Sequence, residues 1–450
     1  MRRSTERRSS VFTLSAFLAI VGVIQLASPV RARNADPTFA EDVAPILYKN
    51  CTVCHHDGGM GPFSLITYDT AAAHADEIRD AVAERVMPPW HSTDPHGSFA
   101  NDRRLSDEER NTILRWIDAG AKPGDLKKLP PKPEYAGGWA IGTPDLVVSM
   151  AEDFPIPASG TVDYQYFQMQ VNIAEDKWVE AIEIMPSARE VVHHVLAYAA
   201  APLPAPAANS APVAAASTAA APPPLLIRNR DQAQPPPAPR HDTTNARPER
   251  MGSLVGTYVP GTNVVRFPAG TAMRLRPGMV LTFQMHYTAH GHATHDRTSI
   301  GFRFAKAPPA EEIFASEFVN GQFKIPPGAK DVAVPAEIGF SRPVRVWGLM
   351  PHTHLRGTRW LYRLELPDSS SRVILDVPHY DFNWQTYYMF ARPLEIPAGG
   401  KITSMAWYDN STSNKHNPDP NVEVRWGAQT WEEMQYTGFM YSVVGRKVTP

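Results

Sequence analysis

The segment Leu281-Thr282-Phe283-Gln284-Met285-His286-Tyr287-Thr288 alternates apolar and polar side chains along its whole length. Successive side chains of a β-strand point to opposite faces, so the odd-numbered residues here form an apolar face and the even-numbered residues a polar one. Strict alternation of this kind predicts a half-buried strand. Its polar face carries Gln284 and His286 toward a cleft or toward solvent.

The same two-residue period runs through residues 143–450, where short apolar runs are broken by proline, glycine and aspartate. This pattern predicts an all-β region, built most simply as sandwiches. The region is too long for one sandwich, so we expect two such domains, at residues 143–307 and 308–450. An Ala/Pro-rich insert at 199–250 interrupts the first domain, and its composition predicts a disordered loop without chemistry. The clearest further strand patterns lie at 146–150, 161–171, 177–184 and 191–198.

Residues 37–121 follow a helical pattern instead. A short amphipathic stretch covers 39–48, and an Ala-rich helix is expected over 70–86. A third helix starts at Ser106, which with Glu109 has the spacing of a capping box. These residues therefore predict a small all-α domain before the β region, followed by a Pro/Lys-rich linker at 122–142.

Between the first two helical stretches lies Cys51-Thr52-Val53-Cys54-His55, which holds the only two cysteines of the chain. Cys-x-x-Cys-His attaches a c-type haem through two thioethers and offers the adjacent imidazole as an axial iron ligand. A redox dithiol, a zinc knuckle and a disulfide are the alternatives. The first lacks a βαβ context, and the second lacks another ligand pair nearby. The motif therefore predicts one covalent haem c, bound by Cys51, Cys54 and His55.

Three helices around such a motif resemble a small cytochrome c domain, here residues 37–121. The resemblance implies a methionine as the sixth iron ligand. Met87 stands in the rigid loop Val86-Met87-Pro88-Pro89-Trp90 and is the expected ligand, with Met60 as the rival. The alternative for Met87 is a core residue, because methionine commonly fills gaps in cores.

Residues 1–32 have the pattern of a secretory signal peptide, with a basic start, an apolar run at 11–27 and the cleavage site Val30-Arg31-Ala32. We therefore expect a periplasmic or secreted protein, exported through the general secretory route, with an uncleaved anchor as the alternative. No later segment is long and apolar enough to span a membrane. The formal net charge of −2 gives no indication of nucleic-acid binding.

Four short segments of the β region carry side chains suited to transition metals. His352 and His354 are two residues apart and converge from one side of an extended segment, whereas His193 and His194 do so only at a bulge or a strand end. Taken singly, each has an ordinary alternative as a surface or core residue, and we expect His290, His292 and His295 to lie at the surface. The segments are His193-His194, Gln284-Met285-His286-Tyr287, His352-Thr353-His354 and Glu432-Glu433-Met434-Gln435-Tyr436.

In this order the four segments resemble the copper type II monooxygenases, the family of peptidylglycine α-hydroxylating monooxygenase and dopamine β-monooxygenase. The resemblance covers about residues 143–448. It implies two eight-stranded jelly-roll sandwich domains, each holding one copper on a shared solvent cleft. The first copper would be bound by His193, His194 and His286, and the second by His352, His354 and Met434. The resemblance selects Met434 over Met440, which strand periodicity places on the same face.

The resemblance also implies roles for these residues. Dioxygen would be used at the Met434 copper to hydroxylate a C–H bond, with Met434, His352, His354 and Gln284 as the catalytic residues, while the other copper would hold the second electron. Two imidazoles with a thioether favour Cu(I), and zinc does not choose a thioether.

Two positions depart from the family. Met350 and Gly438 stand where the amidating enzymes hold substrate with an arginine and a tyrosine, so a peptidylglycine substrate is not expected. The fused haem would replace or relay the small reductant of the animal enzymes. The sequence thus predicts an exported, haem-fused copper monooxygenase that acts on a small molecule and takes electrons from an external donor. The alternatives are a non-catalytic electron-transfer or copper-handling protein, and a zinc-dependent hydrolase or binding module.

Overall fold

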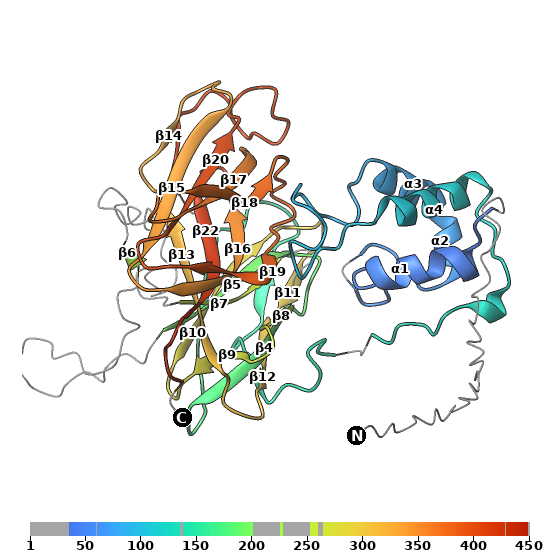
Figure 1. The fold of residues 1–450 in the computed structure, drawn as a ribbon. Helices are drawn as coiled ribbons and strands as arrows, with labels where there is room; N and C mark the ends of the chain where they lie inside the picture. The colour runs from blue at the N-terminus through green and yellow to red at the C-terminus, as the bar shows by residue number, and fades with distance from the viewer. Residues whose placement is uncertain are drawn as a thin grey trace, which may run out of the picture. The chain divides into compact units, whose positions relative to one another are not determined.

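The computed structural model describes residues 36–59, 61–135, 138–200, 226–227, 253–259, 264–427 and 429–448. The predicted signal peptide, the rival ligand Met60 and most of the Ala/Pro-rich insert lie outside the described residues. The structure is mostly β-sheet, with 40% strand and 12% helix, and it contains several sandwich-like sheets. This confirms the prediction of a β-rich chain (Figure 1).

The helices fall at the start of the described chain and share a small hydrophobic core that includes Phe39, Leu47, Ile113 and Trp116. The predicted capping box of the last helix is present. The expected helix over 70–86 is instead two helices, interrupted at His74. The helices are η1 (Phe39–Val43), α1 (Ala44–Asn50), α2 (Tyr68–Ala73), α3 (Ala75–Ala83), α4 (Asp107–Asp118) and η2 (Leu126–Lys128).

The largest sheet has nine strands and crosses the expected domain boundary at residue 308. Its two halves are joined by parallel pairing of Glu311 with Thr271. The order is β1 (Leu146–Ser149), β12 (Ser299–Phe304), β4 (Lys177–Met185), β9 (Thr271–Leu275), β13 (Glu311–Val319), β22 (Tyr436–Val443), β16 (Val344–His352) and β19 (Tyr388–Ile396), with β8 (Val264–Arg266) paired to β4.

Two further sheets complete the sandwich-like packing. A four-stranded sheet has the order β3 (Gln165–Gln170), β10 (Val280–Tyr287), β5 (Val192–Ala200) and β7 (Ser253–Tyr258). A five-stranded sheet has the order β18 (Ser371–Val377), β17 (Gly357–Glu365), β20 (Lys401–Tyr408), β15 (Val332–Phe340) and β6 (Leu226–Ile227). Two short pairs join β11 (Thr294–Asp296) to β2 (Phe154–Ile156) and β14 (Lys324–Ile325) to β21 (Val424–Arg425).

The β region has two hydrophobic clusters. One draws most of its members from residues 148–313, including strands of the four-stranded sheet. The other draws most of its members from 318–443, including strands of the five-stranded sheet. Each cluster also takes residues from the nine-stranded sheet, which therefore contributes to both cores.

The segment between α3 and α4 packs against the β region. Trp90 and Phe99 are buried in the second β cluster, and Phe99 forms a bridge with Phe390 of β19. The N–H of Ala100 donates to the carbonyl of Met389 at 2.7 Å. Sequence patterns did not predict this, because the segment has no alternation of its own. Within the described residues, no helix has the length and apolar character needed to cross a bilayer.

Candidate metal centre

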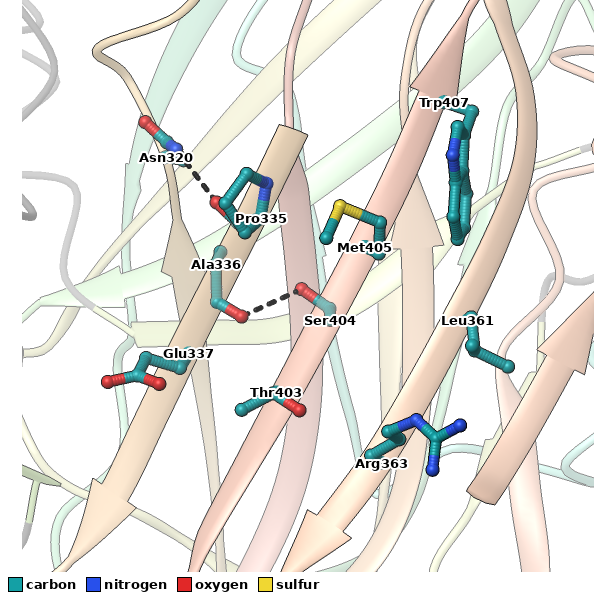
Figure 2. Close-up of a pocket in the computed structure, with 10 residues that line it drawn as sticks. All are labelled: Asn320, Pro335, Ala336, Glu337, Leu361, Arg363, Thr403, Ser404, Met405 and Trp407. Atoms are coloured by element: carbon teal, nitrogen blue, oxygen red, sulfur yellow. Dashed lines mark hydrogen bonds between the residues drawn. The ribbon is translucent and has the colours of Figure 1, made fainter. Parts of the chain in front are cut away.

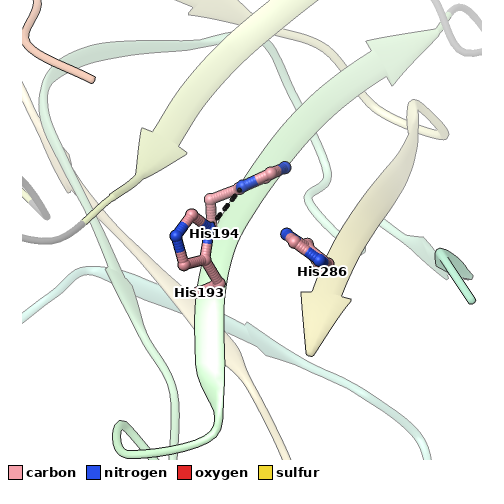
Figure 3. A group of neighbouring side chains, drawn as sticks. All are labelled: His193, His194 and His286. Carbon is pink, nitrogen blue, oxygen red and sulfur yellow. Dashed lines mark hydrogen bonds between the residues drawn. The ribbon is translucent and has the colours of Figure 1, made fainter. Parts of the chain in front are cut away.

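The first histidine set lies on two paired strands of the four-stranded sheet. His286 of β10 pairs with His194 of β5, whereas the next residue, Tyr287, pairs with Val192. His193 is therefore an extra residue in β5, which is the bulge that two adjacent histidines need in order to face one ligand. Figure 3 shows the three imidazoles grouped at this point.

The donor atoms of this set converge. One ligand nitrogen from each of His193, His194 and His286 lies within 4.8 Å of the others. The Nδ1 atoms of His193 and His194 are 3.2 Å apart, and the buried Nδ1 of His286 has no hydrogen-bond partner. Nε2 of His194 lies 3.2 Å from the hydroxyl of Tyr164, which occupies its other side. The three residues therefore bring one ring nitrogen each close enough together to bind a single ion.

Burial keeps these imidazoles neutral. Burial lowers the pKa of His193 to about 4. Burial, together with the neighbouring His193, lowers the pKa of His286 to about 3. Burial and the surrounding imidazoles hold the pKa of His194 well below its usual value. A neutral imidazole is the form that binds a metal, so the site needs no deprotonation near neutral pH.

The second set lies at the end of β16. Nδ1 of His352 is 2.8 Å from Oε1 of Gln385, and Nδ1 of His354 is 3.2 Å from the carbonyl of Glu432. Because both oxygens only accept, each Nδ1 carries the proton and each Nε2 keeps its lone pair. Nε2 of His354 is buried without a hydrogen-bond partner. The two ring centroids are 5.2 Å apart.

Met434 is half-buried in the segment that precedes β22. It is joined to the second histidine set through its neighbour Glu433, whose carboxylate accepts the N–H groups of His354 and Met434. Met440 lies within β22 and is buried in the first β cluster. Since the strand begins after Met434, the two methionines do not share a strand face, contrary to the sequence-based expectation.

The two histidine sets adjoin each other. The ring centroids of His194 and His352 are 6.3 Å apart. Phe382 stacks on His193 at 5.0 Å and lies 5.9 Å from His354, so its ring contacts both sets. The resemblance implied a shared solvent cleft between the sets, whereas here the five imidazoles and Phe382 form one continuous cluster.

Gln284 is buried on β10, and its Nε2 donates to the Tyr166 hydroxyl at 2.9 Å. This contact gives it a role in joining β10 to β3. His290, His292 and His295 are exposed, as predicted. Four residues of the centre were not assigned a role from the sequence, because only Glu433 lies in a predicted ligand segment, and there Met434 was the expected ligand. They are Tyr164, Phe382, Gln385 and Glu433.

The Cys-x-x-Cys-His motif follows α1. Cys51 and Cys54 form no disulfide, and the N–H groups of Cys54 and His55 donate to the Cys51 carbonyl. Nδ1 of His55 donates to the carbonyl of Phe63 at 3.1 Å, which leaves Nε2 as the lone-pair donor. A Cβ at Gly61 would lie 2.6 Å from this Nδ1, so the close approach to the imidazole requires glycine. The donor set fits a c-type haem.

Met87 lies in the turn after α3 and is half-buried. Its N–H donates to the Ala81 carbonyl at 3.0 Å, which fixes its backbone to the end of the helix. Its role as the sixth iron ligand stays a prediction.

A separate hollow of about 460 Å³ lies on the five-stranded sheet, over β15, β17 and β20. Figure 2 shows its lining, which includes Glu337, Arg363, Met405 and Trp407 and none of the predicted site residues.

Comparisons with known proteins add no family. No family model matches the chain, and no curated protein matches it. Among solved structures, the major capsid protein P2 from bacteriophage PM2 has a TM-score of 0.28 at 9% identity, covering 68% of this chain and 100% of that chain. Paenibacillus xanthan lyase has a TM-score of 0.17 at 10% identity, covering 66% of this chain and 25% of that chain. The VP2 subviral particle of infectious bursal disease virus also has a TM-score of 0.17 at 10% identity, covering 67% of this chain and 72% of that chain. Scores this low assign neither fold nor function.

Proposed function

We propose that the chain is an exported, haem-fused copper monooxygenase, with a cytochrome c domain at 37–121 and two jelly-roll copper domains at 143–307 and 308–450. The observation that carries the proposal is the pair of adjoining histidine sets. The nitrogens of the first set converge, the second set keeps its Nε2 atoms free through hydrogen bonds at Nδ1, and each set contains a buried nitrogen without a hydrogen-bond partner. The convergence of three imidazole nitrogens is what distinguishes these atoms from other unpaired buried atoms of the described residues.

The donor chemistry favours copper over zinc. Three neutral imidazoles suit copper in both redox states, and two imidazoles with the Met434 thioether suit Cu(I). When bound, copper at these sites supplies one-electron redox chemistry and a place for dioxygen. The chain's own residues hold the imidazoles: Gln385 and the Glu432 carbonyl orient the second set, and Tyr164 occupies the outer nitrogen of His194.

The haem-binding motif supports the same proposal. When bound, a c-type haem supplies a one-electron carrier from an external donor. The helical region is tied to the metal centre through residues 90–101, since Asn101 donates to the Tyr387 carbonyl at 2.6 Å and accepts the Met389 N–H at 3.0 Å. Tyr387 is two residues beyond Gln385, which orients His352. The haem-binding region and the centre therefore share this loop.

The substrate is a small molecule without a carboxylate at the position used by the amidating enzymes. Met350 is 1% exposed, and a Cβ at Gly438 would lie 3.3 Å from its Cε. Apolar atoms of Met350 therefore lie beside Gly438, at the two positions where the amidating enzymes hold a carboxylate. Small molecules without a carboxylate are the first class to test.

The test is oxygen consumption by the copper-loaded, reduced protein with a panel of small amines, phenols and amides. We expect substrate-dependent uptake and a product heavier by one oxygen atom. Copper binding without any oxygen uptake would replace this proposal with a non-catalytic electron-transfer or copper-handling protein. Zinc retained in the presence of excess copper would favour a hydrolase or binding module instead.

A further inference from the structure

Glu433 is a fully buried carboxylate, at 0% exposure, and it stands directly before the expected ligand Met434. Its oxygens accept three backbone N–H groups: those of His354 at 2.8 Å, Arg356 at 2.6 Å and Met434 at 3.3 Å. His354 belongs to the His-x-His segment, Arg356 follows it by two residues, and Met434 belongs to the methionine segment. A single side chain therefore joins the two parts of the chain that supply the second ligand set.

A buried guanidinium offsets part of the free-energy cost of burying the Glu433 side chain. Arg356 is also 0% exposed, and its charge lies near Glu433. Its Nε donates to Oδ1 of Asn410 at 2.7 Å, and its Nη1 donates to the Trp431 carbonyl at 2.9 Å. A buried carboxylate without such partners would be strongly destabilising. The network is therefore satisfied without help from a metal ion.

We propose that Glu433 is the positioning residue that assembles the His352, His354 and Met434 ligand set before a metal binds. This inference rests on the proposed function, because it concerns the second copper of that proposal. Without the carboxylate, the two segments have to be ordered by the metal itself, and the entropy of ordering them is subtracted from the binding free energy. Groups that hold metal ligands in place by hydrogen bonds are known to raise metal affinity by orienting those ligands.

Glu432 provides a matched control one residue away. Its side chain accepts the Gln429 N–H at 3.0 Å and so caps a neighbouring turn. Only its backbone carbonyl contacts His354, and that contact survives any change of side chain. Glu432→Gln and Glu433→Gln are therefore the same chemical change at adjacent positions, and only the second affects the link between the two segments.

The experiment measures copper affinity of the full-length, haem-containing protein by competition with a copper chelator. In Glu433→Gln, an amide NH₂ replaces one accepting oxygen and meets a backbone N–H. We expect the affinity of one copper to fall by about 10- to 100-fold, with the Cu(II) EPR spectrum of that site changed, while the other copper is bound as in the wild type. Glu432→Gln should match the wild type at both sites.

Three results would overturn the inference. They are equal weakening of both coppers, unchanged affinity of both, and a loss of apoprotein stability without a site-specific change. If Glu433→Gln does not fold, Glu433→Asp takes its place: it keeps the carboxyl group, shortens the reach, and should weaken the same single copper to a smaller extent. A wild-type protein that binds no second copper would defeat the proposed function itself, which is a different outcome.

Discussion

The imidazole of His194 lies 6.3 Å from that of His352, centroid to centroid, although the two residues belong to strands of different sheets. His194 is held by Tyr164 and His352 by Gln385, so each ring is oriented from its own side of the contact. The two histidine sets are therefore in ring contact with each other across the boundary between the two sheets.

Replacing His286 with alanine should remove one copper and leave the other. The buried Nδ1 of His286 has no hydrogen-bond partner among the described residues, so the change breaks no hydrogen bond at that atom and deletes one of three donors to the first ion. Copper analysis of the purified variant should give about half the wild-type copper content, because one of two three-ligand sites is lost. Unchanged copper content would exclude the residue as a ligand, and His290→Ala at the exposed surface is the control.

Met434→Ala and Met440→Ala should behave differently. Loss of the thioether should weaken Cu(I) binding at one site by more than about 100-fold, the upper range for an outer partner. Met434 is half-buried against the first β cluster, so its truncation should also lower the free energy of unfolding, but by less than truncation of the buried Met440. Met440 is a core residue, and its truncation should cost about 2–5 kcal/mol of folding free energy while both coppers remain bound. A copper loss confined to Met440→Ala would show that the ligand is misassigned.

Cys51→Ala combined with Cys54→Ala should abolish the covalent haem. No other cysteine exists to form a thioether. Peroxidase staining on a denaturing gel should follow the wild-type polypeptide and disappear in the double variant, and staining that persists would contradict the assignment. His55→Ala should keep some attached haem but lose the axial ligand, which an absorption spectrum detects.

Phe99→Ala should destabilise the β region although Phe99 lies between two helices of the helical region. Its ring is 3% exposed and packs on Tyr388 and Phe390, each at 5.5 Å between centroids. Truncation should cost about 3–5 kcal/mol in denaturant unfolding. The exposed His96 of the same segment is the control, and equal stability of the two variants would show that the packing on β19 contributes nothing.

Much of the centre follows from local sequence. Alternation over 281–288 places Gln284 and His286 on one face of a strand, and the bulge that adjacent histidines need is present at His193. A spacing of two brought the rings of His352 and His354 within 5.2 Å of each other. The first of these features depends on the strand period, and the other two on the close spacing of the histidines along the chain, which is why one sequence was enough to predict them.

Other features depend on contacts between distant segments. Phe382 and Gln385 come from a loop whose position is set by β18 and β19, and neither belongs to a metal-binding motif. The continuity of the nine-stranded sheet rests on two parallel residue pairs between β9 and β13, which no pattern within either strand indicates. Such pairings are tertiary in origin and therefore have no local signature.

The central claim is that the two histidine sets hold two copper ions in a chain that also carries one haem. The most direct measurement is the metal content of the exported full-length protein by mass spectrometry after copper loading and removal of loosely bound ions. The account predicts two coppers and one iron per chain. One zinc or one copper per chain, with no iron, would contradict it.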